Sequence, residues 1–197
     1  MPSAVPAKAE GPVDLPLHYD LVAAAIHWAT AALIVAQLLV GFVFHAMERG
    51  PLRSEWFGWH KTLGLTILAL ALARLAWRLG HKPPPWPTEM ARWERSLAAW
   101  AHRLFYFVLI ALPLTGLIAV SAYTGQDSIA LAGGLSLPPI PGVPEGVGEI
   151  GEEVHKNLVP LTVALIALHL AAALWHRFEG PRLMTGRMPP FRGRGTL

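Results

Sequence analysis

Paired histidines are the residues of this chain whose type and spacing could carry chemistry. His155 and His169 are fourteen residues apart, and residues 158–175 carry no formal charge. Because fourteen residues at 3.6 per turn come within about 40° of four full turns, both imidazoles face one side of a helix, roughly 21 Å apart. An imidazole inside a bilayer needs a polar partner, so we expect both rings to point into a helix bundle.

The same interval recurs in the three other apolar segments of the chain. It joins His27 to Gly41, His60 to Arg74, and His102 to Gly116. If all four segments are helices of one bundle, these positions form two levels along the membrane normal. The outer level holds His60 and His155 beside Gly41 and Gly116, and the inner level holds His27 and His169 with Arg74 and His102 nearby.

Each level has the composition that a flat macrocycle between helices requires. Such a cofactor takes two axial ligands from opposite walls and needs small residues where it meets backbone. The propionates of a haem also need cations, and a buried arginine can pair with carboxylates bidentately. We therefore predict His27 with His169 and His60 with His155 as iron ligands, with Arg74 and Arg78 as partners of the propionates.

Composition narrows both the class of protein and its redox chemistry. The chain has 197 residues, of which 53% are hydrophobic and only 15% charged, which is too apolar for a soluble domain of this size. The absence of cysteine excludes disulfides, iron–sulfur ligation, thiolate-ligated haem and covalent haem attachment. A non-covalent haem held by His or Met remains. The net charge is +3. The basic residues flank the apolar spans instead of forming one stripe, so we expect no nucleic-acid partner.

The four apolar segments predict an all-α fold, an integral membrane four-helix transmembrane bundle. We place the helices at about residues 20–45, 56–79, 95–123 and 155–177, within one domain of residues 17–180. Gly50-Pro51, the prolines at 83–85 and the Gly/Pro-rich residues 124–154 break the pattern between helices. We expect residues 1–16 to form a disordered tail and not a signal peptide. We expect residues 181–197 to form a basic cytoplasmic tail.

The distribution of Lys and Arg predicts the orientation in the membrane. Residues 78–103 contain five Lys or Arg, and the tail from Arg177 contains five arginines. The loop before the fourth helix is acidic, with Asp127 and four glutamates against Lys156. The positive-inside rule therefore places the second loop and both termini in the cytoplasm.

Four motifs resemble the bacterial cytochrome b561 family of four-helix di-haem b cytochromes. They are IHW at residues 26–28, H-x-x-x-G at His60–Gly64 followed by Arg74, FYFVLIALPLTGL at 105–117, and the His155 and His169 pair leading into ALHLAAALWH. The resemblance covers about residues 17–190. It implies two haem b groups ligated by one histidine from each of the first two helices and two from the fourth. It also implies electron exchange with quinone, and some members resemble quinone-linked superoxide oxidases.

We therefore predict a di-haem b-type membrane cytochrome of the bacterial inner membrane. It would transfer electrons between the outer face and the quinone pool, as a quinone-linked oxidoreductase of the superoxide-oxidase kind. The expected partners are membrane lipid, ubiquinone or a similar quinone, and an outer-face electron donor or superoxide. His102 is a candidate for proton handling at the quinone site, because its unperturbed pKa suits proton transfer near neutral pH. Gly41, Gly64 and Gly116 are candidate cofactor-contacting glycines.

Other interpretations stay open at this point. The chain could be a haem-bearing anchor for a soluble dehydrogenase or hydrogenase, or a metal transporter, although transporters usually use carboxylate or Met ligands that these spans lack. A single histidine near a helix end can be an interfacial residue, and the glycines can be ordinary packing residues. Arg74 and Arg78 can serve topology alone. We expect His45 to lie in a loop and His176 to be solvated at the membrane surface.

Overall fold

Four long helices make up the chain in a computed structural model, which describes residues 18–86, 90–123, 128–178 and 187–188. They are α1 (Leu21–Ala46), α2 (Pro51–Gly80), α3 (Arg92–Tyr123) and α4 (Glu145–Phe178). All four are long and apolar enough to cross a membrane. The prediction of an all-α, four-helix transmembrane bundle is therefore confirmed.

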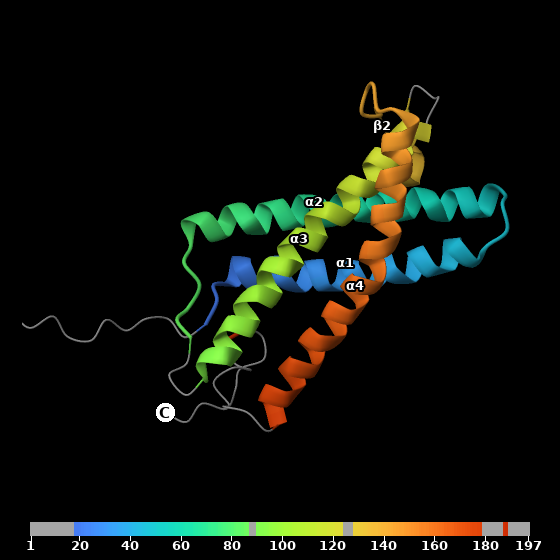
Figure 1. Cartoon of the computed structure of the whole chain (residues 1–197). Helices are drawn as coiled ribbons and strands as arrows, with labels where there is room; N and C mark the ends of the chain where they lie inside the picture. The colour runs from blue at the N-terminus through green and yellow to red at the C-terminus, as the bar shows by residue number, and fades with distance from the viewer. Residues whose placement is uncertain (1–17, 87–89, 124–127, 179–186, 189–197) are drawn as a thin grey trace, which may run out of the picture.

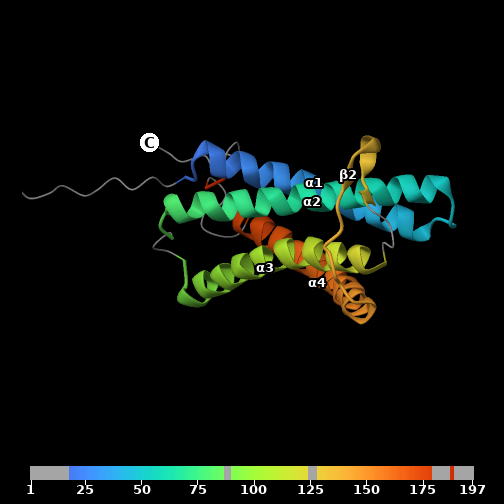
Figure 2. The same cartoon turned by 90° about the horizontal axis from the view of Figure 1, so that it is seen from above.

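The helices form two antiparallel pairs that cross one another. α1 packs along α2 and α3 packs along α4, while α2 and α3 connect the two pairs (Figures 1 and 2). We call the end of the bundle that contains the start of α1 and the end of α2 the inner end, and the opposite end the outer end. The start of α3 and the end of α4 also lie at the inner end (Figure 1).

The core consists mostly of small residues, as expected where helices pack in lipid. Ala24, Ala71 and Ala119 are buried, together with the larger Val108 and Leu165. Many large apolar side chains point outward instead, which gives the helices a surface suited to hydrocarbon.

An N-cap fixes the start of α1 and ties it to α2. The carboxylate of Asp20 accepts the Ala23 N–H at 2.8 Å and the indole N–H of Trp77 at 3.2 Å. Desolvation acts to raise the pKa of Asp20, but these hydrogen bonds and the nearby His81 outweigh it and leave the pKa below its usual value. The cap therefore carries its full negative charge at the positive end of the helix.

Three helices begin earlier than the sequence predicted, and α3 does so by only three residues. α2 begins at Pro51 and not at residue 56, because proline is tolerated in the first turn, where its missing N–H has no helical partner. α4 begins at Glu145, ten residues before the predicted start. Gly148 and Gly151 are buried there against α3, so close that a Cβ on Gly148 would lie 2.2 Å from the Ala122 Cβ. The glycines permit close helix packing and do not end the helix.

The described part of the loop before α4, residues 128–144, covers the outer end of α2. It contains a short antiparallel hairpin of β1 (Ile129–Ala130) and β2 (Ser136–Leu137), joined through the 3₁₀ turn η1 (Ala132–Gly134). The Ala132 N–H donates to the Thr62 hydroxyl at 3.0 Å, and the Ile140 N–H donates to the Ser121 hydroxyl at 3.0 Å. Side chains of α2 and α3 thus hold this loop, whose path the sequence did not predict.

Candidate functional site

The outer pair of histidines meets between α2 and α4. The ring centroids of His60 and His155 lie 6.1 Å apart, with the rings tilted by 74°. His155 donates from Nδ1 to the Leu112 carbonyl oxygen at 2.8 Å, while Nε2 of His60 accepts the amide N–H of Gln37 at 3.3 Å. Both rings therefore have their lone pair on Nε2, which is free for a metal in His155, whereas a metal at His60 would have to displace the Gln37 amide.

Two glycines leave the space beside these rings. A Cβ on Gly41 would lie 3.4 Å from Cε1 and Nδ1 of His60. A Cβ on Gly116 would lie 3.2 Å from the same two atoms of His155. The predicted outer level is thus assembled in space, with a glycine on α1 and one on α3 each facing one imidazole.

The inner pair meets between α1 and α4. The ring centroids of His27 and His169 lie 6.4 Å apart at an interplanar angle of 70°. Arg74 reaches from α2 and donates from Nη1 to Nδ1 of His27 at 2.8 Å. The ring of Phe105 lies 5.2 Å from that of His169 and gives the pair an aromatic wall.

His102 lies next to the inner pair, as the sequence predicted. Its ring centroid is 6.0 Å from that of His169, and its Nδ1 donates to the Ala98 carbonyl oxygen at 2.6 Å. This hydrogen bond fixes the tautomer, so that Nε2 of His102 can accept a proton or a hydrogen bond.

Both pairs fit a metal centre with two axial imidazoles. In each pair, two imidazoles from different helices have ring centroids 6.1 or 6.4 Å apart, so they could hold one metal ion between them. Among the described residues there is no group of three or more His, Cys, Asp or Glu that could hold a metal ion. Two protein ligands leave the equatorial positions of an octahedral ion empty, and the four nitrogens of a porphyrin supply them. The donor set therefore suits haem.

The other residues considered in the sequence analysis lie outside the two histidine pairs. A Cβ on Gly64 would lie 3.4 Å from the Gln37 amide nitrogen, so this glycine makes room for an amide. Arg78 lies at the inner end with its guanidinium 5.9 Å from the Tyr106 ring. His45 is exposed, but in the last turn of α1 and not in a loop. His176 is half-buried, and its Nδ1 is buried without a hydrogen-bond partner among the described residues, so the residue expected to be solvated is only partly exposed.

Sequence reasoning missed two residues near the site. Gln37 lies between the two levels, and its buried Oε1 has no hydrogen-bond partner among the described residues. Its position four residues before Gly41, on the same face of α1, was a usable signal. Arg187, which follows α4, is only 7% exposed and lies at the inner end. No periodic pattern in the sequence indicated that it belongs there.

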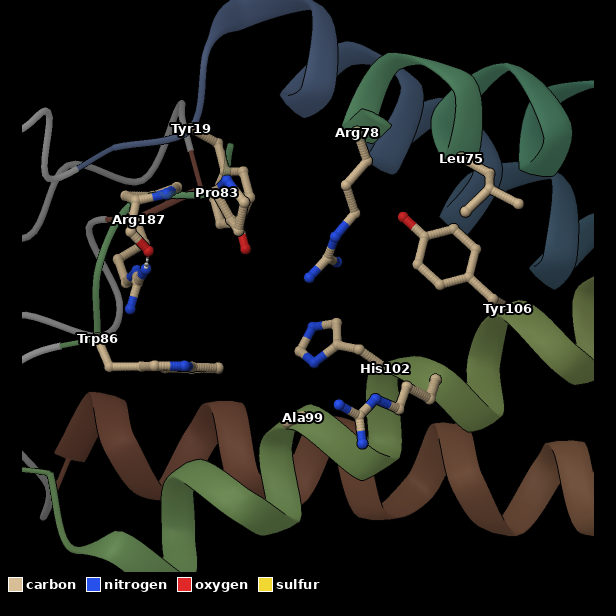
Figure 3. A pocket seen from close by; sticks show the side chains of 11 residues that line it. Tyr19, Leu75, Arg78, Pro83, Trp86, Ala99, His102, Tyr106 and Arg187 are labelled. Atoms are coloured by element: carbon tan, nitrogen blue, oxygen red, sulfur yellow. Dashed lines mark hydrogen bonds between the residues drawn. The ribbon is translucent and has the colours of Figure 1, made fainter. Parts of the chain in front are cut away.

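Two adjoining cavities open at the inner end of the bundle. One, of about 330 Å³, lies between α2, α3 and the segment before α3, and His102, Arg78 and Tyr106 line it (Figure 3). The second, of about 430 Å³, shares Arg78 and Tyr106 and extends to Arg74, which contacts the inner histidine pair. The inner pair is therefore connected to the bundle surface through polar side chains.

Comparison with known proteins finds matches over most of the chain. A family model described as "Prokaryotic cytochrome b561" matches residues 18–190. The chain is 28% identical over 174 residues to "Cytochrome b561 homolog 1" of Escherichia coli (strain K12), an alignment that covers 85% of this chain and 94% of that protein. It is 26% identical to "Cytochrome b561 homolog 2" of the same organism, covering 84% and 87% of the two chains. It is also 28% identical to "Probable superoxide oxidase CybB" of Yersinia pestis, covering 81% and 89%.

Proposed function

Because this chain belongs to the prokaryotic cytochrome b561 family of membrane electron-transfer proteins, we propose that it is a di-haem b cytochrome that exchanges electrons with membrane quinone. The observation that carries the proposal is the assembly of two histidine pairs at two levels. His27 faces His169 and His60 faces His155, with ring centroids 6.4 and 6.1 Å apart. Each pair draws one ring from α4 and one from another helix, so ligands approach from opposite walls of the bundle.

The side chains around the pairs hold the imidazoles in orientations that suit iron ligation. Bound haem supplies reversible one-electron transfer at its iron. The hydrogen bond from His155 Nδ1 to the Leu112 carbonyl oxygen fixes the tautomer that leaves Nε2 as the ligand atom. Arg74 supplies a cation beside the inner pair that can neutralise propionate carboxylates. Gly41 and Gly116 keep the space beside the outer pair open.

The inner end supports exchange with quinone. Quinone reduction takes up two electrons and two protons, so a proton-carrying group must lie near the electron donor. His102 meets this requirement, since its ring centroid is 6.0 Å from that of His169 and it also lines a cavity at the bundle surface. Nε2 of His102 can accept a proton from the aqueous side and pass it on, while Nδ1 stays bonded to the Ala98 carbonyl oxygen.

The outer end supports an anionic one-electron donor, and we propose superoxide. Arg53 donates to the Phe44 carbonyl oxygen, and the Phe44 ring lies 5.0 Å from that of His60. The Lys61 Nζ lies 4.6 Å from the Phe57 ring, so two cations that could attract an anion lie near the outer pair, at an end that also carries the glutamates of α4. The name of the Yersinia pestis relative agrees with this choice of donor. Two superoxide anions, one quinone and two protons would give two molecules of O₂ and one quinol.

The test is a reduced-minus-oxidised optical spectrum of the purified protein, together with its haem content. We expect b-type bands and two haems per chain. Reduction of a short-chain ubiquinone should then follow addition of superoxide and stop when superoxide dismutase is present. A haem-free or single-haem protein would contradict the di-haem proposal. Two haems without superoxide-driven reduction would contradict only the choice of donor.

A further inference from the structure

The lining of the 330 Å³ cavity at the inner end is positively charged. Three guanidiniums line it, from Arg78 on α2, Arg103 on α3 and Arg187 beyond α4, together with the imidazole of His102. No Asp or Glu is present among the described residues that line it. Figure 3 shows Arg78 and His102 on one side of the space and Arg187 with Trp86 on the other. Three cations without a counter-charge repel one another, so the cavity suits an anion.

Arg187 is built into this cavity and is not part of a loose surface. Its side chain donates from Nη2 to the Pro84 carbonyl oxygen, and its own carbonyl oxygen accepts the Tyr19 N–H at 3.0 Å. The guanidinium lies 5.1 Å from the Trp86 ring and 5.9 Å from the Tyr19 ring. The segments before α1, after α2 and after α4 therefore meet at this residue.

One nitrogen of this guanidinium lacks an acceptor. Nη1 of Arg187 is buried and has no hydrogen-bond partner among the described residues. An unpaired N–H of a charged group is costly to bury, and burial lowers the pKa of this guanidinium. An anionic oxygen in the cavity would remove that cost. A carbonyl oxygen already satisfies Nη2, so the vacant donor points to a ligand and not to internal packing.

The position of the cavity indicates the kind of anion. Arg103 directly precedes the uncharged residues 104–123, and Arg78 lies in the last turn of α2, so both mark the membrane surface. Trp86 and Tyr106, which also line the cavity, are residue types that concentrate at this depth. Phosphate groups of phospholipids lie at the same depth, and basic pockets between membrane helices bind such headgroups.

We propose that this cavity is a phosphate-binding site in which Arg187, Arg78 and Arg103 hold the phosphate of an anionic phospholipid headgroup or a free phosphate. Planar guanidiniums match phosphate oxygens bidentately, and three of them can surround one group. Arg78 also lines the neighbouring cavity, and its five N–H donors allow it to serve both. The three arginines are not ligands of the predicted metal centres, but His102, the proposed proton carrier, lines the same cavity, so the competition with a short-chain ubiquinone described below distinguishes a phosphate site from a quinone site.

The experiment measures ligand binding to the full-length, haem-loaded protein in detergent by calorimetry. The probes are short-chain phosphatidylglycerol, short-chain phosphatidylcholine and inorganic phosphate. Loss of a charge-assisted hydrogen bond should weaken phosphate binding at least tenfold in Arg187→Ala, and Arg187→Lys should recover part of it. Arg103→Ala should also weaken binding, and because this side chain is exposed, the variant should fold normally. The matched control is Arg92→Ala, which removes one positive charge from the exposed start of α3, outside the cavity.

The probes separate the two sources of phosphate. Tighter binding of phosphatidylglycerol than of inorganic phosphate, sensitive to Arg187, assigns the site to a headgroup, and the reverse order assigns it to free phosphate. Equal weakening by Arg92→Ala and Arg187→Ala would show only a general surface potential and would overturn the proposal. So would the absence of binding by every probe, displacement of the bound lipid by a short-chain ubiquinone, or loss of haem in Arg103→Ala.

Discussion

Arg74 Nη1 lies 2.8 Å from Nδ1 of His27, although the two residues belong to different helices. A guanidinium only donates hydrogen bonds, so Nδ1 of His27 is the acceptor and Nε2 carries the ring proton. Iron ligation through Nε2 would move that proton to Nδ1 and break this hydrogen bond, which frees Arg74 for a haem carboxylate. His60 and His155 already have the ligating tautomer, but the Gln37 amide would have to leave Nε2 of His60 before a metal could bind there.

We therefore expect Arg74→Gln to weaken retention of the inner haem selectively. The variant removes the cation that would pair with a propionate, and a lost charge-assisted bond corresponds to roughly tenfold or more in affinity. Haem content after gel filtration should fall from two toward one per chain. Arg49→Gln, in the exposed turn between α1 and α2, should keep both haems. Equal haem content in the two variants would show that Arg74 serves only His27 or membrane topology.

Substitution of the histidines tests the pairing itself. His169→Ala should leave about one haem per chain, and adding His27→Ala should cost little more, because both changes affect the same site. His169→Ala combined with His155→Ala should remove both haems. Haem must be counted on folded, membrane-inserted protein, because a missing ligand also lowers stability. A folded, haem-free His27→Ala/His169→Ala protein, with His60→Ala unaffected, would show that the pairing is wrong.

His102→Ala should slow haem–quinone electron exchange while both haems stay bound. The imidazole lies beside the inner pair without being part of it, so its loss removes a proton carrier and leaves the predicted ligands in place. Stopped-flow mixing with a quinol analogue measures the exchange, and the optical spectrum reports the haems. Unchanged exchange kinetics would remove His102 from the mechanism.

Gly148→Ala should destabilise the contact between α3 and α4. The new Cβ would lie 2.2 Å from the Ala122 Cβ, and overpacking of this kind typically costs about 1–3 kcal/mol. Gly146→Ala is the matched control, because a Cβ at that position has no atom within 4 Å. Thermal unfolding in detergent, followed by circular dichroism, should give a lower Tm for the first variant only. Equal Tm values for the two variants would indicate that the two helices can separate there without loss of stability.

Orientation can be tested at the end of the chain. Basic residues concentrate between α2 and α3 and after α4, so a reporter fused after Leu197 should be active only if it works in the cytoplasm. A cytoplasmic fluorescent reporter and an exported phosphatase reporter at the same position give opposite signals. Phosphatase activity there would invert the assignment of the inner end.

The sequence by itself determined the fold class, the family and the grouping of residues into two levels. These features follow from local geometry, because a helix advances by a fixed angle per residue and a span must match the bilayer. The fourteen-residue interval therefore places His155 and His169 on one face whatever surrounds them. The assignment of the histidines as iron ligands stays a prediction that the haem counts above will test.

Only the tertiary structure decided which residues touch across helices. The bond from Arg74 to His27, the amide of Gln37 at His60 and the place of Arg187 in the inner cavity depend on how each helix is rotated and on which helix lies beside it. The start of α4 at Glu145 also depends on packing against a neighbouring helix. Glycine disfavours an isolated helix, yet close packing against α3 outweighs that preference, and packing energy depends on a neighbour that is distant in sequence.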